Sequence, residues 1–409
     1  MYIFKRLFAS IFLIAILFFS TTNAISAWDV LVAEFNRQGF SSFGQMGGLM
    51  RGNVYRSDDM FNMYARLHNL KNRNEIHGFN IVRSNTGQLS SANFYQMQIP
   101  FYTLAEHSRR LWSLNNFLEN QTSENETRLL FVNPPPVFLR GTAADFARGL
   151  PFYDLNPSQD VFLQNLHRLR VDFLDLRTTF AVGNLCSDRY TFQTDHSWTT
   201  EAAFMAFGDI VYRLNSGFGS DLDFDGFFRD AANYYFLVYE DSFLGSFGRR
   251  AGLAFSGADD FTLILPRFQT DFTFEYVSAG LTEIRQGPFE ESLIFSEYLE
   301  LTGDVRQSNI IATYLGGVRP WGRIVNNNAS DAPTLLLIHD SFGPLVAPYL
   351  AKVFSEVRMI RATETTNPIN IEEYLQINYF DFVIILVRSE NLINGSAFNF
   401  FVNPLRGVQ

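Results

Sequence analysis

Short apolar runs alternate with amphipathic segments along this chain, and this alternation limits the folds that it can adopt. The runs lie at 129–132, 334–338, 357–360 and 380–387, and Leu, Ile, Val and Phe dominate the first, second and fourth of them. Strands that are apolar at nearly every position are buried on both faces, as in a parallel sheet covered by helices. We therefore expect an α/β fold, a three-layer α/β/α sandwich with a mostly parallel sheet.

The segments between these runs have the patterns of helices. Residues 161–170 carry apolar side chains at helical spacing and lead into a strand predicted at 171–176. A second helix is predicted over 200–214, with Thr199 as its N-cap and Gly217 after its end. A third follows over 344–354. In contrast, 271–277 alternates with period two, which predicts an exposed antiparallel strand in an inserted segment.

The first 27 residues have the features of a signal peptide. Lys5 and Arg6 precede an uncharged run over 7–20, and small residues follow up to Ala27. The run is shorter than the roughly 18 to 20 residues that span a bilayer, so cleavage is favoured over an uncleaved anchor helix. We expect an exported protein, in the periplasm or at the cell surface, with one domain over 28–409. No later stretch predicts a membrane span.

Charge and residue spacing exclude several classes of function. A net charge of -10 and a pI near 5.2, with no basic cluster, argue against a nucleic-acid partner. Cys186 is the single cysteine, so no internal disulfide can form. The stretch 221–226 imitates the start of a calcium loop, but Ala232 stands where a bidentate Glu is needed. No metal or cofactor is expected.

Ser341 is the candidate nucleophile, because it stands between a buried strand and a helix. That junction lies at the carboxyl edge of a parallel sheet, where ligands bind. The alternative is that Asp340 or Ser341 only caps the helix. A base must accept the serine proton, and His196 is the candidate, with Asp195 to orient its ring. In an extended segment neighbouring side chains point apart, which argues against this pairing unless the loop is irregular.

Four segments in order resemble landmarks of the DHHW family, which belongs with the AlgX/AlgJ-type SGNH-hydrolase-like proteins of polysaccharide O-acetylation. They are 194–204, 244–252, 314–317 and 337–350, within a resemblance that covers roughly residues 128 to 390. The resemblance implies the SGNH (flavodoxin-like) version of the sandwich, with Ser341 as nucleophile and an acid/base segment from Asp195 to Trp198.

The same resemblance implies several binding residues. Backbone N–H groups near Ser341, Gly316 and Gly317 would form an oxyanion hole. Trp198 would contact the substrate. Arg249 and Arg250 would hold an anionic acyl donor or a sugar carboxylate, unless they are solvated loop charges.

The chain departs from the family pattern at three places. The family has Asp-x-His-Trp, but Ser197 stands directly before Trp198 and the histidine is one place early. Val318 replaces an Asn that relatives carry after the glycine pair. His339 stands where relatives have Gly or Lys, which makes it a second candidate for the base.

Two functional readings follow, from different classes. The first is an extracytoplasmic enzyme that transfers or removes O-acyl groups, such as acetyl, on a surface or exported polysaccharide, with a membrane-bound protein as acyl donor. The second is a degenerate member of the same fold that binds the polysaccharide or helps to assemble it. A secreted esterase for small substrates remains open.

Overall fold

The computed structural model describes residues 2–38, 57–76, 80–91, 99–121, 126–138, 154–182, 190–278, 280–300, 305–362, 370–393 and 398. The chain divides into two units, 1–71 and 72–409. Cys186 lies outside the described residues.

The described residues of the first unit form the helices α1 (Tyr2–Gln38) and α3 (Ser57–Leu70). The predicted signal segment is the first part of α1, and the helix continues beyond residue 27. Within the described parts of the chain, no helix has both the length and the apolar character of a membrane span. Cleavage of the signal segment remains a prediction.

The second unit is built on a large mixed sheet. Its strand order is β5 (Phe173–Asp175), β4 (Arg128–Asn133), β13 (Phe382–Leu386), β11 (Thr334–His339), β12 (Glu356–Arg361), β10 (Trp321–Asn326), β8 (Phe272–Ser278) and β9 (Leu281–Gly287). The strands from β5 to β12 are parallel, and β10, β8 and β9 add antiparallel pairs. The predicted fold class, an α/β architecture with a mostly parallel sheet, is confirmed.

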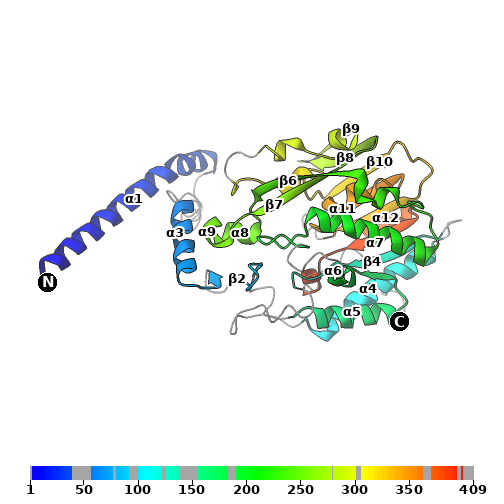
Figure 1. Cartoon of the computed structure of the whole chain (residues 1–409), viewed down its shortest axis with the longest axis horizontal. Coiled ribbons are helices and arrows are strands. Elements are labelled where there is room, and N and C mark those ends of the chain that lie inside the picture. The colour runs from blue at the N-terminus through cyan, green and yellow to red at the C-terminus, as the bar shows by residue number, and fades with distance from the viewer. Residues whose placement is uncertain are drawn as a thin grey trace. The chain divides into compact units, whose positions relative to one another are not determined.

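Helices cover both faces of this sheet and give it two apolar cores. Along β11, Leu335 and Leu337 pack with α7 (Thr200–Phe218) and α11 (Gly343–Leu350), whereas Leu336 and Ile338 pack on the opposite face. The helices of that second face are α4 (Phe101–Glu119), α5 (Asn156–Arg168) and α12 (Ile371–Ile377). Figure 1 shows α7 on one side of β4 and α4 and α5 on the other. The continuous apolar pattern of β11 follows from this burial on both faces.

The helix predicted over 200–214 forms with its predicted N-cap. The Thr199 hydroxyl accepts a hydrogen bond from the Ala202 N–H at 3.2 Å. The helix ends later than predicted, because Gly219 and not Gly217 adopts the left-handed conformation, with φ of +70°. Gly217 stays helical, so the first glycine after the apolar pattern was the wrong stop signal.

The alternating segment 271–277 forms β8, which is antiparallel to both of its neighbours. It belongs to the main sheet and is not exposed throughout, since Phe272, Phe274 and Tyr276 are buried. The sequence did not predict the separate pair of β6 (Tyr234–Phe243) and β7 (Asp259–Pro266), nor the small sheet of β1 (Glu75–Ile76), β2 (Ile81–Arg83) and β3 (Leu89–Ser91).

The calcium-like stretch 221–226 has a structural role in this fold. The Asp223 carboxylate accepts hydrogen bonds from the N–H groups of Phe228 at 2.8 Å and Arg229 at 3.2 Å, and it pairs with the Arg229 guanidinium at 2.9 Å. Its oxygens therefore organise the turn at η3 (Phe227–Arg229). Among the described residues, no group of three or more metal-ligating side chains is found.

The remaining elements are short. They are α6 (Leu176–Val182), η4 (Ala231–Asn233), α8 (Ser246–Ala251), α9 (Leu253–Ser256), α10 (Phe289–Ser292), η5 (Ser296–Tyr298), η6 (Ile310–Thr313) and η7 (Ser389–Ile393).

Candidate active site

Ser341 lies in the turn between the end of β11 and the start of α11, at the carboxyl edge of the parallel strands. Its Oγ is buried and has no hydrogen-bond partner in the part of the chain that the structure describes. Its backbone N–H also makes no hydrogen bond with the described residues. Buried polar atoms are normally paired, so an unpaired hydroxyl and N–H at a strand end are typical of a functional site.

The Asp340 carboxylate fixes this turn to the neighbouring strand. One oxygen accepts from the Phe342 N–H at 3.1 Å, and the other accepts from the Arg388 N–H at 2.8 Å and the Asn391 amide at 2.7 Å. Arg388 and Asn391 follow β13, which pairs with β11. The Asp340 carboxylate therefore positions Ser341, and both of its oxygens have hydrogen-bond partners within the protein.

His196 and Asp195 lie in a tight loop that precedes α7. Thr191 and Trp198 form an isolated antiparallel bridge, and the Phe192 N–H donates to the Ser197 carbonyl at 3.0 Å. The chain therefore reverses its direction between them. In such a loop neighbouring side chains need not point apart, and this removes the geometric objection to an Asp195–His196 pair.

Other segments hold this loop in place. The Asp259 carboxylate, at the start of β7, accepts from the Gln193 N–H at 2.7 Å and the Thr194 N–H at 2.9 Å. On the other side, the buried Gln88 amide donates to the Phe192 carbonyl at 2.9 Å. Asp259 and Gln88, which are distant from the loop in the sequence, therefore hold it in place.

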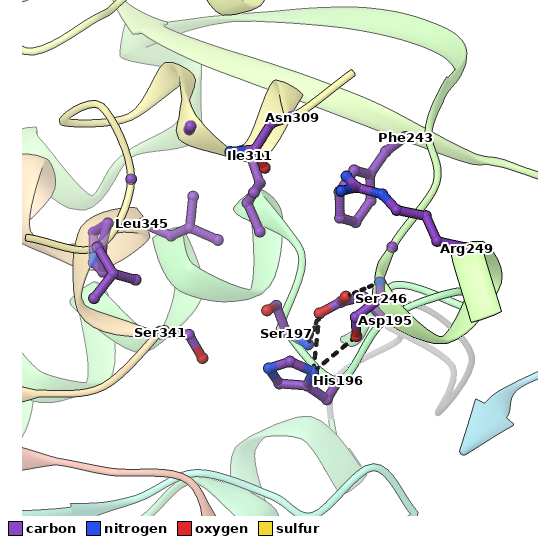
Figure 2. A pocket seen from close by; sticks show the side chains of 15 residues that line it. Asp195, His196, Ser197, Phe243, Ser246, Arg249, Asn309, Ile311, Ser341 and Leu345 are labelled. Atoms are coloured by element: carbon purple, nitrogen blue, oxygen red, sulfur yellow. Dashed lines mark hydrogen bonds and ion pairs between the residues drawn. The ribbon is translucent and has the colours of Figure 1, made fainter. Parts of the chain in front are cut away.

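The carboxylate of Asp195 is held by two backbone N–H groups and faces the His196 ring. It accepts from the Ser197 N–H at 2.9 Å and the Ser246 N–H at 2.6 Å, and one oxygen lies 3.3 Å from His196 Nδ1. The Ser246 hydroxyl also lies 3.3 Å from Nδ1. Because Nδ1 faces the carboxylate, the other ring nitrogen, Nε2, is turned toward Ser341 (Figure 2).

The pKa values of both residues are lowered from their ordinary values. Burial alone would raise the pKa of Asp195, but the His196 charge and hydrogen bonds from Ser246 and Ser197 outweigh it. Burial lowers the pKa of His196, and the attraction of Asp195 offsets this only in part. Near neutral pH the pair therefore consists of a carboxylate and a neutral imidazole, the state that a general base requires.

One pocket of about 250 Å³ joins the two segments. It is lined by Asp195, His196, Ser197, Phe243, Gly245, Ser246, Arg249, Asn309, Ile311, Ala312, Gly317, Val318, Ser341, Pro344 and Leu345. In Figure 2 the Ser341 hydroxyl points to the side of the pocket where His196 and Ser197 lie. Ser341 and His196 do not share a hydrogen bond in this structure.

The predicted binding residues divide between the pocket and its surroundings. Gly317 lines the pocket, but its N–H donates to the Tyr314 carbonyl at 3.0 Å and is not directed at a ligand. Gly316 and Arg250 do not line it, and Arg250 is exposed. Val318 does line it, as an apolar side chain.

Trp198 and His339 are buried and do not line the pocket. The Trp198 ring stacks on Phe342, with centroids 4.7 Å apart, so it ties the His196 loop to the Ser341 turn. The Nδ1 atom of His339 lies 2.6 Å from the Asp340 carbonyl, beneath Gly343. This places His339 in the core beside α11, away from the position that the second candidate base would need.

Arg249 lines the pocket, although its guanidinium is largely used by the protein. It donates to the Leu244 carbonyl and to the Ser308 carbonyl, each at 2.8 Å. It therefore fixes the segment that brings Asn309 to the pocket. Among the described residues no carboxylate pairs with Arg249, so its positive charge remains available to a bound anion.

The sequence did not identify Ser246, Phe243, Asn309 or Ile311 as site residues. Ser246 lies in the segment 244–252, one of the four that resemble the family, so the sequence offered a signal for it. It is the first residue of α8, and its N–H donates to the Asp195 carboxylate. Asn309 and Ile311 come from a segment with no motif or periodicity. Only the folded structure brings them to Ser341.

Comparisons with known proteins give matches of fold. Neither protein-family models nor curated proteins match the chain. Among solved structures, Bacillus cereus PatB1 with a sulfonyl adduct is similar with a TM-score of 0.60 and 19% identity, over 78% of this chain and 96% of that one. A second structure of Bacillus cereus PatB1 is similar with a TM-score of 0.58 and 20% identity, over 76% of this chain and 96% of that one.

A DHHW family protein from Eubacterium siraeum is similar with a TM-score of 0.53 and 16% identity, over 79% of this chain and 97% of that one. The predicted resemblance to the DHHW family is thereby confirmed at the level of the fold.

Proposed function

We propose that this chain is an extracytoplasmic enzyme that transfers or removes O-acyl groups on a surface or exported polysaccharide, with Ser341 as its nucleophile. The observation that carries the proposal is one shared pocket. An unpaired serine hydroxyl, a neutral histidine and an ionised aspartate line it together. These are the three groups of a serine acyl-transfer site.

Each group has a defined step. Ser341 Oγ attacks the acyl carbonyl carbon while His196 Nε2 accepts its proton, and the Asp195 carboxylate holds Nδ1 and stabilises the imidazolium. The C–O bond to the leaving alkoxide then breaks, and His196 returns the proton to that oxygen. A sugar hydroxyl or water attacks the serine ester next, and Ser341 recovers its proton through His196.

The oxyanion is stabilised by the free backbone N–H of Ser341. The exposed amide of Asn309 faces the same pocket and supplies a further donor for the polar part of the substrate. The missing hydrogen bond between Ser341 and His196 does not oppose these roles. Catalytic hydrogen bonds are often long without substrate and shorten when the reactants bind.

Two further observations support acyl chemistry. PatB1, which has the same fold, carries a sulfonyl adduct, and sulfonyl groups attach to activated nucleophiles. The ordered motifs resemble proteins of polysaccharide O-acetylation, which act outside the cytoplasm with a membrane-bound protein as acyl donor. The predicted signal segment agrees with this location.

The test compares Ser341→Ala with the parent protein. We expect turnover of p-nitrophenyl acetate to fall by about 10³-fold or more, and the acyl-ester content of the acceptor polymer to change in the producing cells. Ser330→Ala, on the exposed surface, is the matched control and should behave as the parent. Equal turnover in Ser341→Ala and the parent would remove the catalytic role.

A binding or assembly role is the second candidate, and Ser197 and the separation of Ser341 from His196 favour it. In that case the pocket would hold an acylated glycan without turnover. Binding of acetylated polymer to the parent, together with no Ser341-dependent ester cleavage, would support this function.

A further inference from the structure

A second pocket, of about 510 Å³, lies where two helices of the second unit end. It is lined by Phe117, Asn120 and Gln121 at the end of α4, and by residues 375–379 at the end of α12. We call it the amide pocket, since amides are frequent among its side chains. None of the lining side chains carries a charge. A ligand is therefore held here by hydrogen bonds and apolar contact, and not by ion pairs.

The amide side chains of this pocket present hydrogen-bond acceptors. The Asn120 side-chain NH₂ donates to the Asn116 carbonyl at 2.6 Å, and the Gln121 NH₂ donates to the Leu375 carbonyl at 3.0 Å. Among the described residues no donor pairs with the side-chain oxygen of Asn120 or Gln121. A ligand that fits these oxygens must supply hydrogen-bond donors.

The helix ends add further acceptors. The last carbonyls of a helix have no partner within it, and those of Gln376 and Ile377 accept no backbone hydrogen bond in the part of the chain that the structure describes. The end of α4 also carries a partial negative charge, which disfavours a carboxylate or a phosphate. A cation would meet no carboxylate in the lining. The pocket therefore suits an uncharged ligand that is rich in O–H groups.

An aromatic ring at the pocket is exposed and held in place. Tyr379 is 40% exposed, and its hydroxyl donates to the Asp381 carboxylate at 3.4 Å. That carboxylate in turn accepts from the Thr334 N–H at 2.7 Å and hydroxyl at 2.8 Å. The ring is thus anchored to the start of β11 before a ligand binds, which lowers the cost of binding. Its apolar face can pack on the C–H face of a sugar ring.

The amide pocket and Ser341 lie at opposite ends of the main sheet. Tyr379 precedes the start of β13, and its anchor Thr334 begins β11, whereas Ser341 follows the end of β11. A strand rises by about 3.3 Å per residue, so the six residues of β11 separate the two ends by roughly 17 Å. A single acylated sugar at Ser341 does not reach the amide pocket, but a polymer can contact both.

We propose that the amide pocket is a second, non-catalytic binding site, and that its ligand is an uncharged polysaccharide chain. Acceptor oxygens bind the sugar hydroxyls, and the Tyr379 ring packs on a sugar face. This inference goes beyond the proposed function, and only the identity of this chain with the acyl acceptor rests on it. A polymer held here would be present at a raised effective concentration near Ser341.

The experiment titrates the full chain with sugars in a calorimeter. The probes are the neutral cellohexaose, laminarihexaose and mannohexaose, and the charged hexagalacturonate, each up to about 10 mM. We expect at least one neutral hexasaccharide to bind through Tyr379, and Tyr379-dependent binding of hexagalacturonate to be at least tenfold weaker. The proposal is overturned if no neutral hexasaccharide binds, or if the charged one binds more tightly through Tyr379.

Variants locate the binding. Tyr379→Ala should raise the Kd of the neutral sugar by about tenfold or more, whereas Tyr379→Phe keeps the ring and should bind as the parent. Gln376→Ala removes an exposed amide and should weaken binding without lowering the melting temperature. Tyr212→Ala is the matched control, because Tyr212 is 66% exposed on α7 and lines neither of the two pockets.

The outcomes separate this inference from the proposed function. Tyr379→Ala should turn over p-nitrophenyl acetate as the parent does, and Ser341→Ala should bind the neutral sugar as the parent does. Equal sugar affinity in Tyr379→Ala and the parent would overturn the inference, as would loss of sugar binding in Ser341→Ala. If turnover does not depend on Ser341 but sugar binding depends on Tyr379, the proposed function fails and the amide pocket stands.

Discussion

The Asp195 carboxylate lies 3.3 Å from Nδ1 of His196, although the two residues are adjacent in the chain. The reversal between Thr191 and Trp198 makes this contact possible. It leaves Nε2 to face Ser341, and it explains how a histidine that is one place early can take the role of a base.

The activity of the parent should persist into mildly acidic solution. His196 must be neutral to accept a proton, and its pKa is lowered from 6.5 by burial and by Arg388, against the attraction of Asp195, Glu390 and Asp340. The value of kcat/KM should therefore rise with pH and level off, with its midpoint below 6.5. A midpoint above that value would assign the proton to another group.

Asp195→Asn should lower kcat by about 10³ to 10⁴-fold, because an amide stabilises neither the correct tautomer nor the imidazolium. The same change removes the attraction that raises the pKa of His196, so the midpoint of the pH profile should move further down. The check is a full pH profile of this variant beside Asp331→Asn, a change on the exposed surface. A midpoint that does not move would contradict the pairing.

His196→Ala should reduce turnover to the level of Ser341→Ala. The double variant His196→Ala/Ser197→His returns an imidazole to the pocket in the order Asp-x-His-Trp, and we expect it to recover part of the activity, about tenfold over the single variant. Steady-state kinetics on the two variants measure this. If the parent is inactive and only Ser197→His hydrolyses esters, the natural protein is a binder.

Gly245→Ala should disturb the loop that carries Asp195. An added Cβ would lie 2.3 Å from the Asp195 Cβ and 2.5 Å from the Thr194 carbonyl oxygen, so the loop must move. Both the melting temperature and kcat should fall, with a loss of about 1 to 3 kcal/mol in stability. In contrast, Gly208→Ala in the interior of α7 has contacts no shorter than 4.0 Å and should stabilise by about 1 kcal/mol.

Lys352→Met should stabilise the protein near neutral pH. Lys352 is buried among the rings of Tyr234, Phe289 and Tyr349, and its ammonium donates to the Pro348 carbonyl at 3.2 Å. Burial lowers its pKa well below 10.5, so the folded chain binds this proton more weakly than the unfolded chain.

The lowered pKa of Lys352 makes the stability of the folded chain depend on pH. Stability is lost as the pH falls from 10.5 toward the lowered pKa of Lys352, and the loss is constant below it. The melting temperature of Lys352→Met should exceed that of the parent by about 2 °C or more at pH 7, and the difference should shrink toward pH 10. A variant that melts lower at pH 7 would contradict this prediction. Lys71→Met, at an exposed position, should show no such dependence.

Much of the fold was predictable because burial on both faces leaves a direct record in the sequence. The runs that became β4, β11 and β13 are apolar at nearly every position, and Thr199 capped its helix as expected. The β6–β7 pair was missed, since Leu237 and Val238 are exposed and give no clear alternation.

The site was less predictable than the fold. Ser341 follows from its place at the end of a strand, and the loop at Asp195 follows from the ordered motifs. The apolar lining of the pocket does not, because Ile311 and Phe243 reach the pocket through packing between segments that are distant in the chain. The rule that neighbours point apart holds only in extended backbone and failed where the chain reverses.

The position of β13 has a consequence for how this protein is made. β13 pairs with β4 on one side and β11 on the other, so residues 382–386 connect strands that begin at Arg128 and Thr334. The centre of the sheet cannot close before residues 382–386 have left the ribosome. A nascent or truncated chain that stops before β13 would expose the paired edges of β4 and β11, and would be a substrate for chaperones and proteases.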